Sequence, residues 1–173
     1  MNICIFCSAY NSSEEYTGAA RELATRIAEG GHTLVWGGSD KGTMKVIADA
    51  AQEAGGKIVG ISVENFRHSA RKNADEMIVA KDLSERKAIL LARSDAVVVL
   101  PGGLGTLDEV SEVVELKKQG FHKKKVVILN VANFYEGLKI QMARMDKEGF
   151  IPHALAELVH FATTPKEVMD YLA

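Results

Sequence analysis

The chain has 173 residues, a length that predicts one globular domain with a core large enough to fold without a metal or a disulfide. Hydrophobic residues make up 47% of the chain, charged residues make up 25%, and the formal net charge is −2. This balance is ordinary for a soluble protein and gives no field that would attract nucleic acid or an anionic membrane, so we expect small-molecule or protein partners.

The N-terminal segment over residues 1–10 is apolar, but it lacks a basic start and is too short for a secretion signal or a membrane span. We therefore expect the mature chain to begin here and the protein to be cytoplasmic. Cys4 and Cys7 have C-x-x-C spacing, yet they lie on an expected strand and would face opposite sides of it. No second cysteine or Cys/His pair completes a zinc set, so we interpret both as free thiols and predict no metal site. The histidines are scattered without metal-ligand spacing and are interpreted as surface or turn residues: His32, His68, His122, His153 and His160.

Apolar and amphipathic segments alternate along the chain. The patterns predict buried strands over residues 2–7, 32–37, 57–63, 76–80, 95–100 and 125–130, with a further short apolar segment over 158–162. They predict helices over residues 13–29, 43–54, 83–93, about 105–118 and about 134–147, and a closing helix from Pro165. Strands that are apolar on both faces and separated by helices form parallel sheets covered on both sides. The sequence thus predicts an α/β fold, a single doubly wound Rossmann-like domain over residues 1–173 with a mostly parallel sheet.

The loop after the fifth strand has three glycines within four residues, in the sequence VVVLPGGLGTLDEV. Ligands of doubly wound sheets bind at the carboxyl ends of the strands, where helix N-termini attract anions. Gly102, Gly103, Gly105 and Thr106 are therefore candidates for a phosphate cradle, and a tight turn with no ligand is the equal alternative. The pattern is neither G-x-G-x-x-G nor a P-loop, so a dinucleotide or ATP hydrolysis is disfavoured and no cofactor is expected.

The same segment, PGGLGTLDE, resembles the P-G-G-x-G-T-x-x-E signature of the Lonely Guy family, the cytokinin-activating phosphoribohydrolases that often carry the label "lysine decarboxylase". LSERKAILLARSDAVVVLPGG is similar to the M-x-x-R-K segment of that family, and ICIFCSA, NVANFYEGL and KEGFI also resemble family segments. Two departures stand out. The usual G-G-G-x-x-G-L-M-G reads GGSDKGTMK over residues 37–45, with Ser39 and Lys45 in place of glycines, and Leu83 replaces a methionine.

The resemblance implies hydrolysis of the N-glycosidic bond of a purine nucleoside 5′-monophosphate to free base and ribose 5-phosphate, without a cofactor. Such cleavage develops positive charge on the ribose, so it needs a carboxylate near the ring and an activated water. The family role implied for Glu109, three residues after Thr106 on the same helix face, is to stabilise that charge and position the water. An acid that only complements the helix dipole is the alternative, and it suits Asp108 better.

Arg86 matches the catalytic arginine of the family and could hold a phosphate, or Glu109 in its ionised form. Lys87 matches the motif lysine, which implies that it binds substrate, although it points in another direction from Arg86 on a helix. Without the family pattern, the E-R-K triplet is usually a solvated helix face. Leu83 would offer an apolar surface to the base.

Further candidates for the site lie at the ends of the first two strands. Ser8 and Gly38 are expected to bind substrate, with Gly37 and Gly42 completing that edge, although each is equally compatible with a turn. Thr43 is favoured as a first-turn helix residue. Trp36 is favoured as a core residue over a platform for the base. The polar loop over residues 67–76 is compatible with a lid and with a solvated connector.

The family resemblance also implies a homodimer with the site near the subunit interface. Leu107, Val110, Val113, Val114 and Leu116 on the helix after the glycine loop could supply part of that surface, and core packing is the alternative. A different class of function stays open as well, a Rossmann-like protein that binds a nucleotide or another phosphorylated ligand without catalysis. Amino-acid decarboxylation is disfavoured because no setting for a pyridoxal phosphate lysine is recognisable.

Overall fold

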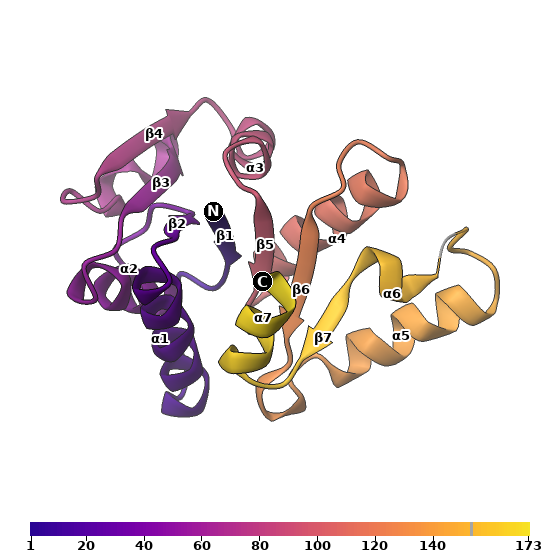
Figure 1. The fold of residues 1–173 in the computed structure, drawn as a ribbon. Helices are drawn as coiled ribbons and strands as arrows, with labels where there is room; N and C mark the ends of the chain where they lie inside the picture. The colour runs from indigo at the N-terminus through magenta and orange to yellow at the C-terminus, as the bar shows by residue number, and fades with distance from the viewer. Residues whose placement is uncertain (153) are drawn as a thin grey trace.

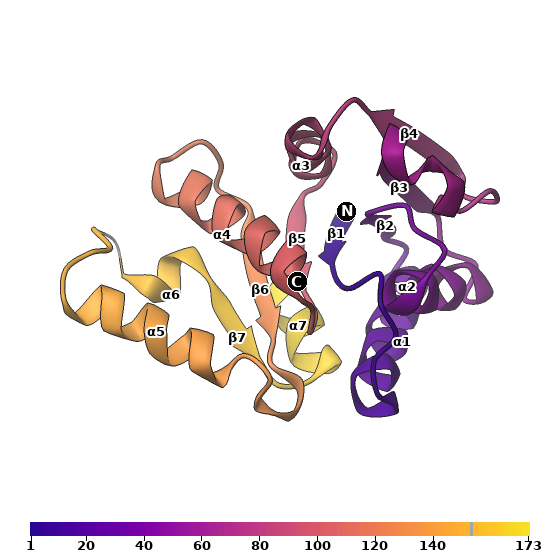
Figure 2. The same cartoon turned by 180° about the vertical axis from the view of Figure 1, so that it is seen from behind.

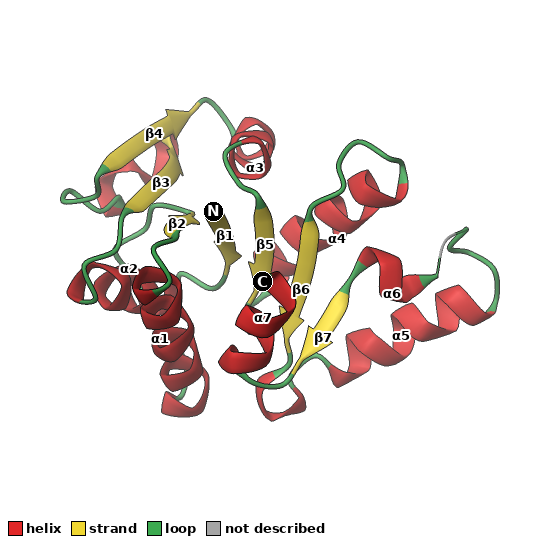
Figure 3. Cartoon of the chain, in the orientation of Figure 1, coloured by secondary structure: helices red, strands yellow, loops and turns green. Residues whose placement is uncertain are grey.

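The computed structural model describes residues 1–152 and 154–173, so the prediction for His153 lies outside the described residues. Its centre is a seven-stranded sheet in the order β4-β3-β2-β1-β5-β6-β7 (Figures 1 and 3). All the strand pairs of this sheet are parallel, which confirms the doubly wound Rossmann-like fold. The strands are β1 (Asn2–Phe6), β2 (Thr33–Trp36), β3 (Ile58–Val63), β4 (Glu76–Ala80), β5 (Ala96–Val99), β6 (Lys125–Leu129) and β7 (His160–Ala162).

Helices cover both faces of the sheet. They are α1 (Glu14–Glu29), α2 (Gly42–Glu53), α3 (Leu83–Ala92), α4 (Leu104–Lys118), α5 (Glu136–Lys147), α6 (Leu155–Leu158) and α7 (Pro165–Leu172). One buried cluster joins the sheet to α1, α2 and α7, and a second joins it to α3, α4, α5 and α6. Figure 1 shows α1 and α7 in front of the sheet, and Figure 2, from behind, shows α4 on the opposite side.

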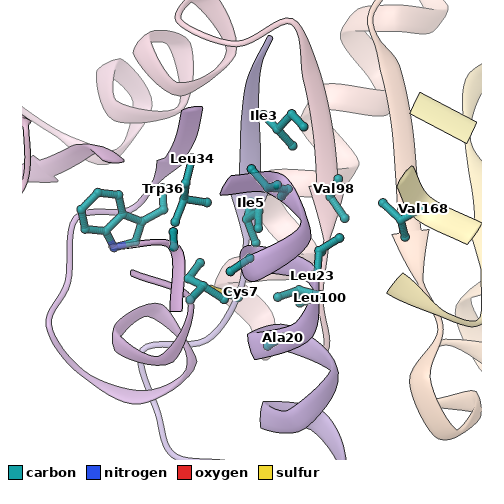
Figure 4. Close-up of a cluster of buried hydrophobic side chains, with 14 of the residues drawn as sticks. Ile3, Ile5, Cys7, Ala20, Leu23, Leu34, Trp36, Val98, Leu100 and Val168 are labelled. Carbon is teal, nitrogen blue, oxygen red and sulfur yellow. The ribbon is translucent and has the colours of Figure 1, made fainter. Parts of the chain in front are cut away.

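Alternation along β1 explains the two core clusters. Ile3, Ile5 and Cys7 pack toward α1, where Leu23 lies against them (Figure 4). Cys4 belongs to the cluster on the other face, so the prediction that the two cysteines face opposite sides of the strand is confirmed. Figure 4 also shows Trp36 among the buried side chains, where its relative exposure is 0%, which confirms its assignment to the core.

The chain reverses its winding direction between β1 and β5. These two strands are neighbours in the sheet, and the Leu100 N–H donates to the Phe6 carbonyl at 2.9 Å, so their carboxyl ends lie side by side. In sheets of this kind ligands bind at such a switch point. The loops that follow Phe6 and Leu100 therefore form the centre of the candidate site.

Three local features differ from the sequence-based expectation. The polar stretch after β3 contains the short helix η1 (Glu64–Ser69), and α6 was not expected. After β6 the chain forms η2 (Val131–Asn133), where Ala132 and Asn133 have φ of 49° and 60°, so α5 begins at Glu136 rather than near Phe134. Left-handed residues interrupt a helix, and glycine, the usual signal for them, is absent there. No helix of the described chain is long and apolar enough to span a membrane.

Candidate active site

Arg86 lies in the first turns of α3, whose start is fixed by its capping residues. The Asp82 side chain accepts a hydrogen bond from the Glu85 N–H at 2.8 Å, and the Glu85 carboxylate accepts one from the Lys81 N–H at 2.7 Å. From this turn, Arg86 Nε donates to the Ile61 carbonyl of β3 at 2.9 Å. The guanidinium is thereby aimed at the carboxyl edge of the sheet.

Glu109 forms an ion pair with the terminal nitrogen of that guanidinium. Arg86 Nη1 lies 3.0 Å from Glu109 Oε1, and the two side chains are 11% and 8% exposed. Burial raises the pKa of Glu109, and the nearby Arg86 charge opposes that rise without cancelling it. A carboxyl group whose pKa is raised next to a fixed cation is typical of a site that moves protons or stabilises charge.

Asp108, the acidic neighbour of Glu109, is paired away from Arg86. Asp108 accepts a hydrogen bond from Lys87 Nζ at 2.8 Å, and Lys87 also pairs with Glu112. These ion pairs join α3 to α4. Lys87, expected to bind substrate, thus has its ammonium engaged by two carboxylates of α4, and Arg86 alone of the pair reaches Glu109.

The backbone of Gly37 lies directly against the Arg86 guanidinium, and this contact is here called the Gly37 wall. A Cβ built on Gly37 would lie 1.9 Å from Arg86 Nη2, so any side chain at this position would displace the guanidinium. The next residue, Gly38, is buried with a φ of +73°, a conformation that favours glycine. The two glycines at the end of β2 therefore have geometric reasons to be glycine.

The glycine loop after β5 leads directly into α4. A Cβ on Gly102 would meet Thr106 Oγ1 at 2.2 Å, whereas Cβ atoms on Gly103 and Gly105 would meet nothing within 4 Å. Thr106 is 4% exposed and folds back over Gly102. The Leu107 N–H donates to the Gly103 carbonyl at 3.0 Å as the first helical bond, so the preceding N–H groups point out of the open helix end. This end can accept an anion beside Gly103 and Gly105.

The other predicted substrate-binding residues surround this edge. Ser8 Oγ accepts from the Tyr10 N–H at 3.0 Å, and the Ser8 carbonyl accepts from the Met44 N–H at 3.1 Å, so Ser8 organises the loop between β1 and α1 and joins it to the first turn of α2. Leu83 is 55% exposed at the start of α3, where an apolar ligand could contact it. Thr43 lies in the first turn of α2, as expected.

Two residues near the site had no role in the sequence-based reading. Tyr135 is buried, and its hydroxyl donates to the Leu100 carbonyl at 2.7 Å, so it holds the chain just before the glycine loop. Arg71, within the polar loop over residues 67–76, is 8% exposed and contacts α2. The loop is therefore neither a free lid nor a solvated connector at this position. Tyr135 lies in the NVANFYEGL segment. The resemblance of this segment to the family points to the region but does not predict the hydrogen bond of Tyr135.

The structure also bears on metal binding and on the apolar residues of α4. The described residues include no group of three or more His, Cys, Asp or Glu side chains that could hold a metal ion. On α4, Val110, Val113 and Val114 are buried in the core, so core packing accounts for these three, while Leu107 is 38% exposed and Leu104, next to the glycine loop, is 85% exposed.

The parallel sheet with helices on both faces defines a Rossmann-like protein, and its switch point brings an open helix end, a buried carboxylate and an arginine together. A family model described as "Possible lysine decarboxylase" matches residues 44–172. The cytokinin riboside 5′-monophosphate phosphoribohydrolase of Mycobacterium tuberculosis is 36% identical over 160 residues, covering 91% of this chain and 86% of that protein. The enzyme LOG3 of Arabidopsis thaliana is 33% identical over 173 residues, covering 98% and 80% respectively. The chain therefore belongs to this family, and its resemblance to the Lonely Guy phosphoribohydrolases is confirmed.

Solved structures show the same fold. The molybdenum cofactor carrier protein of Chlamydomonas reinhardtii matches with a TM-score of 0.76 at 25% identity, covering 99% of this chain and 94% of that one. The molybdenum cofactor binding protein of Rippkaea orientalis matches with a TM-score of 0.77 at 24% identity, with the same coverage.

Proposed function

We propose that this protein hydrolyses the N-glycosidic bond of a purine nucleoside 5′-monophosphate, of the AMP or cytokinin type, to free base and ribose 5-phosphate. The observation that carries the proposal is the buried pair of Arg86 and Glu109, joined at 3.0 Å beside the open end of α4. The relatives named as cytokinin riboside 5′-monophosphate phosphoribohydrolases, at 33–36% identity, support the same reaction.

Glu109 supplies the charge that this reaction requires. As the bond between C1′ and the base nitrogen breaks, its electron pair leaves with the base and the ribose ring becomes positive. Water adds its hydroxyl group to C1′, and its proton balances the charge on the departing base. A carboxylate in a partly dehydrated site stabilises the ribosyl cation more strongly than one in water, and it can also accept a hydrogen bond from the attacking water.

The open end of α4 is suited to the 5′-phosphate. Gly103 and Gly105 leave space above the backbone, and the positive end of the helix dipole faces that space. Glu109 lies on the same helix, one turn beyond Gly105. A monophosphate held at the helix end would place its ribose between the cradle and the carboxylate, which explains why one motif carries both groups.

We also infer that the protein acts as a homodimer with the site near the subunit interface. Leu104, 85% exposed, and Leu107, 38% exposed, form an apolar rim next to the glycine loop, and a second copy would cover them. Light scattering after size exclusion tests this, with a dimer mass expected. A monomer at all concentrations used in the activity assay would refute it.

A reducing compartment such as the cytoplasm suits the two cysteines. Cys4 and Cys7 are buried free thiols, and burial raises the pKa of both well above the ordinary range, so they stay protonated and unreactive. Localisation of the tagged full chain tests this part of the proposal.

The alternative function is binding of a phosphorylated ligand without catalysis. Its support is the likeness to the Chlamydomonas carrier protein, whose name gives a molybdenum cofactor as its cargo. Incubation with AMP, an N6-prenylated AMP and adenosine, followed by chromatography for free base, separates the two. Base release that follows enzyme concentration supports hydrolysis. Saturable binding of a monophosphate with no base release would replace hydrolysis by the carrier function.

A further inference from the structure

Arg71 is a buried charged residue that the proposed reaction does not use. Its side chain is 7% exposed. Nη1 donates to Asp40 Oδ1 at 2.9 Å and to Asp49 Oδ1 at 2.7 Å, while Nε and Nη2 donate to Gln52 Oε1 at 3.0 and 2.6 Å. A guanidinium has five N–H groups, so these four hydrogen bonds leave little capacity for a ligand. The side chain is built to hold protein segments together.

The charges around Arg71 are balanced within one group, here called the Arg71 cluster: Arg71, Asp40, Lys45, Asp49 and Gln52. Lys45 Nζ lies 2.7 Å from Asp49 Oδ2 and 3.9 Å from Asp40 Oδ1, so two cations face two carboxylates. Burial opposes ionisation of Asp49, but the hydrogen bonds and charges of Lys45 and Arg71 together lower its pKa. Asp49 is therefore a carboxylate near neutral pH, paired with both cations.

Backbone bonds connect the cluster to the loop between β2 and α2. The Arg71 N–H donates to the Gly38 carbonyl at 2.9 Å, and the Asp40 N–H donates to the Ser69 carbonyl at 2.8 Å. An antiparallel bridge pairs Ser39 with Ala70 between them. The segment that carries Arg71 thus runs beside the β2–α2 loop and is paired with it residue by residue.

The β2–α2 loop in turn touches the candidate active site. Gly37 immediately precedes the paired residues, and its backbone lies against the Arg86 guanidinium. Arg86 is held from three sides: the Ile61 carbonyl at Nε, Glu109 at Nη1, and the Gly37 wall at Nη2. A shift of the loop would remove the third support and let the guanidinium turn away from Glu109.

We propose that Arg71 is a positioning residue for the reaction: it fixes the β2–α2 loop so that Gly37 keeps Arg86 directed at Glu109. The kinetic consequences rest on the proposed function, whereas the effect on the loop does not. The planar fork is essential, because it binds one residue of the loop, Asp40, and two residues of α2, Asp49 and Gln52, at the same time. A lysine at position 71 would keep the charge but could not make these bonds together.

The proposal predicts a change in the acid–base behaviour of Glu109. Arg86 and, more weakly, Lys87 lower the pKa of Glu109, while Asp108 raises it. Cys4, Cys7 and Tyr135 also face this region, and burial raises the pKa of all three, so they stay neutral and do not titrate in the assay range. A weaker hold of Arg86 therefore raises the pKa of Glu109 further.

The experiment compares Arg71→Lys, Arg71→Ala and the milder Asp40→Asn with the parent. Arg144→Ala is the control, since Arg144 of α5 pairs with Glu148, is 70% exposed, and lies outside the cluster. Hydrogen exchange of the amides at positions 40 and 71, measured without substrate, reports the loop. Base release from AMP over a pH series reports the site. Melting temperatures show whether each variant is folded.

Both Arg71 variants are expected to speed amide exchange at positions 40 and 71 and to lower kcat/KM by roughly 10- to 100-fold, the scale of a small misplacement of reacting groups. The acid limb of the kcat/KM profile should move to higher pH, and Arg71→Lys should rescue little. Asp40→Asn should change both readouts in the same direction by less. Folded Arg71 variants with exchange and pH profile like the control would overturn the proposal. If the parent releases no base, the proposed reaction fails, and amide exchange still decides whether Arg71 fixes the loop.

Discussion

Replacing Glu109 with glutamine separates a catalytic role from a structural one. Glutamine has nearly the same shape and can still accept the hydrogen bond that Arg86 Nη1 donates at 3.0 Å, but it has no negative charge for the ribosyl cation. Losing an electrostatic or acid–base group typically costs roughly 10²–10⁴-fold in rate. This corresponds to about 2.7–5.4 kcal/mol of activation free energy, at about 1.36 kcal/mol per factor of ten. Binding of AMP should change little.

Whereas turnover should fall in Glu109→Gln, the free energy of unfolding should stay the same or rise. The pKa of Glu109 is raised in the folded state, with the attraction of Arg86 already included, so the fold favours the protonated carboxyl. Its stabilising contribution is complete below the unfolded pKa, about 4.3, and is lost as the pH rises through the folded pKa. At pH 7 the carboxylate charge therefore costs stability, and Glu109→Gln should be as stable as the parent or more so. A loss of turnover without a loss of stability marks a residue kept for function.

The assay measures base release from AMP at saturating and low concentrations, AMP binding by calorimetry, and unfolding at pH 7. Glu115→Gln is the matched control, because Glu115 lies on the same helix, 52% exposed, and pairs with Lys118. The control should keep turnover within about twofold, as expected for an exposed ion pair worth at most about 1 kcal/mol. Turnover near that of the parent in folded Glu109→Gln, or a large loss of stability, would refute the reasoning.

Further predictions concern the arginine, the phosphate, the pH profile and the backbone. Arg86→Lys keeps a cation but loses the planar guanidinium, so its turnover should exceed that of Arg86→Ala by less than about tenfold. Turnover equal to that of the parent would contradict a contact made by both arms of the guanidinium. AMP should have a kcat/KM at least roughly 100-fold above that of adenosine, since charged hydrogen bonds contribute about 1.5–3 kcal/mol each, and millimolar phosphate should compete; equal activity on both would rule out the cradle. Because Glu109 acts as a carboxylate with a raised pKa, the acid limb of kcat/KM should lie above about 4.3, the ordinary glutamate value, and a limb below it would be inconsistent with this assignment. Ala132→Gly should stabilise the fold by about 0.5–1 kcal/mol, because Ala132 has a φ of 49°; a lower melting temperature would argue against strain there.

The order and type of most elements follow from the sequence because their signals are local. Short runs such as VVVL are apolar on both faces, which is typical of strands covered on both sides, and glycine pairs mark the helix ends. The start of α5 was misplaced by two residues because Ala132 and Asn133 adopt a left-handed conformation that their residue types do not announce. A side-chain hydrogen bond within the turn holds it, because Asn130 Oδ1 accepts from the Tyr135 N–H at 2.6 Å.

The candidate site was partly predictable for a topological reason. All the parallel strands end at one edge of the sheet, so motif and fold place Arg86 and Glu109 at the same edge. The strands that precede them, β4 and β5, are not neighbours, because β3, β2 and β1 lie between them in the sheet. The direct contact of Arg86 with Glu109, and the separate pairing of Lys87 with Asp108, depend on the rotation of α3 and α4, which no spacing encodes. The role of Arg71 was harder still to predict, because its carboxylate partners are 31 and 22 residues away and its own segment is mostly polar. A charged residue in a polar loop gives no sign that it is buried.

The altered segment over residues 37–45 is explained by backbone geometry. Gly37 is needed for the contact with Arg86, Gly38 has a φ of +73°, and Gly42 has a φ of +56° with its added Cβ only 2.4 Å from the Ala9 carbonyl carbon. The two positions where glycine is replaced need none of this: Ser39 has an ordinary φ and forms a bridge to Ala70, and Lys45 lies within α2, where glycine is disfavoured. The segment has thus kept glycine wherever the backbone requires it. Its new charge, at Lys45, is paired with Asp49 in the Arg71 cluster rather than directed at the site. The replacements therefore change how the loop is held and leave the wall against Arg86 intact.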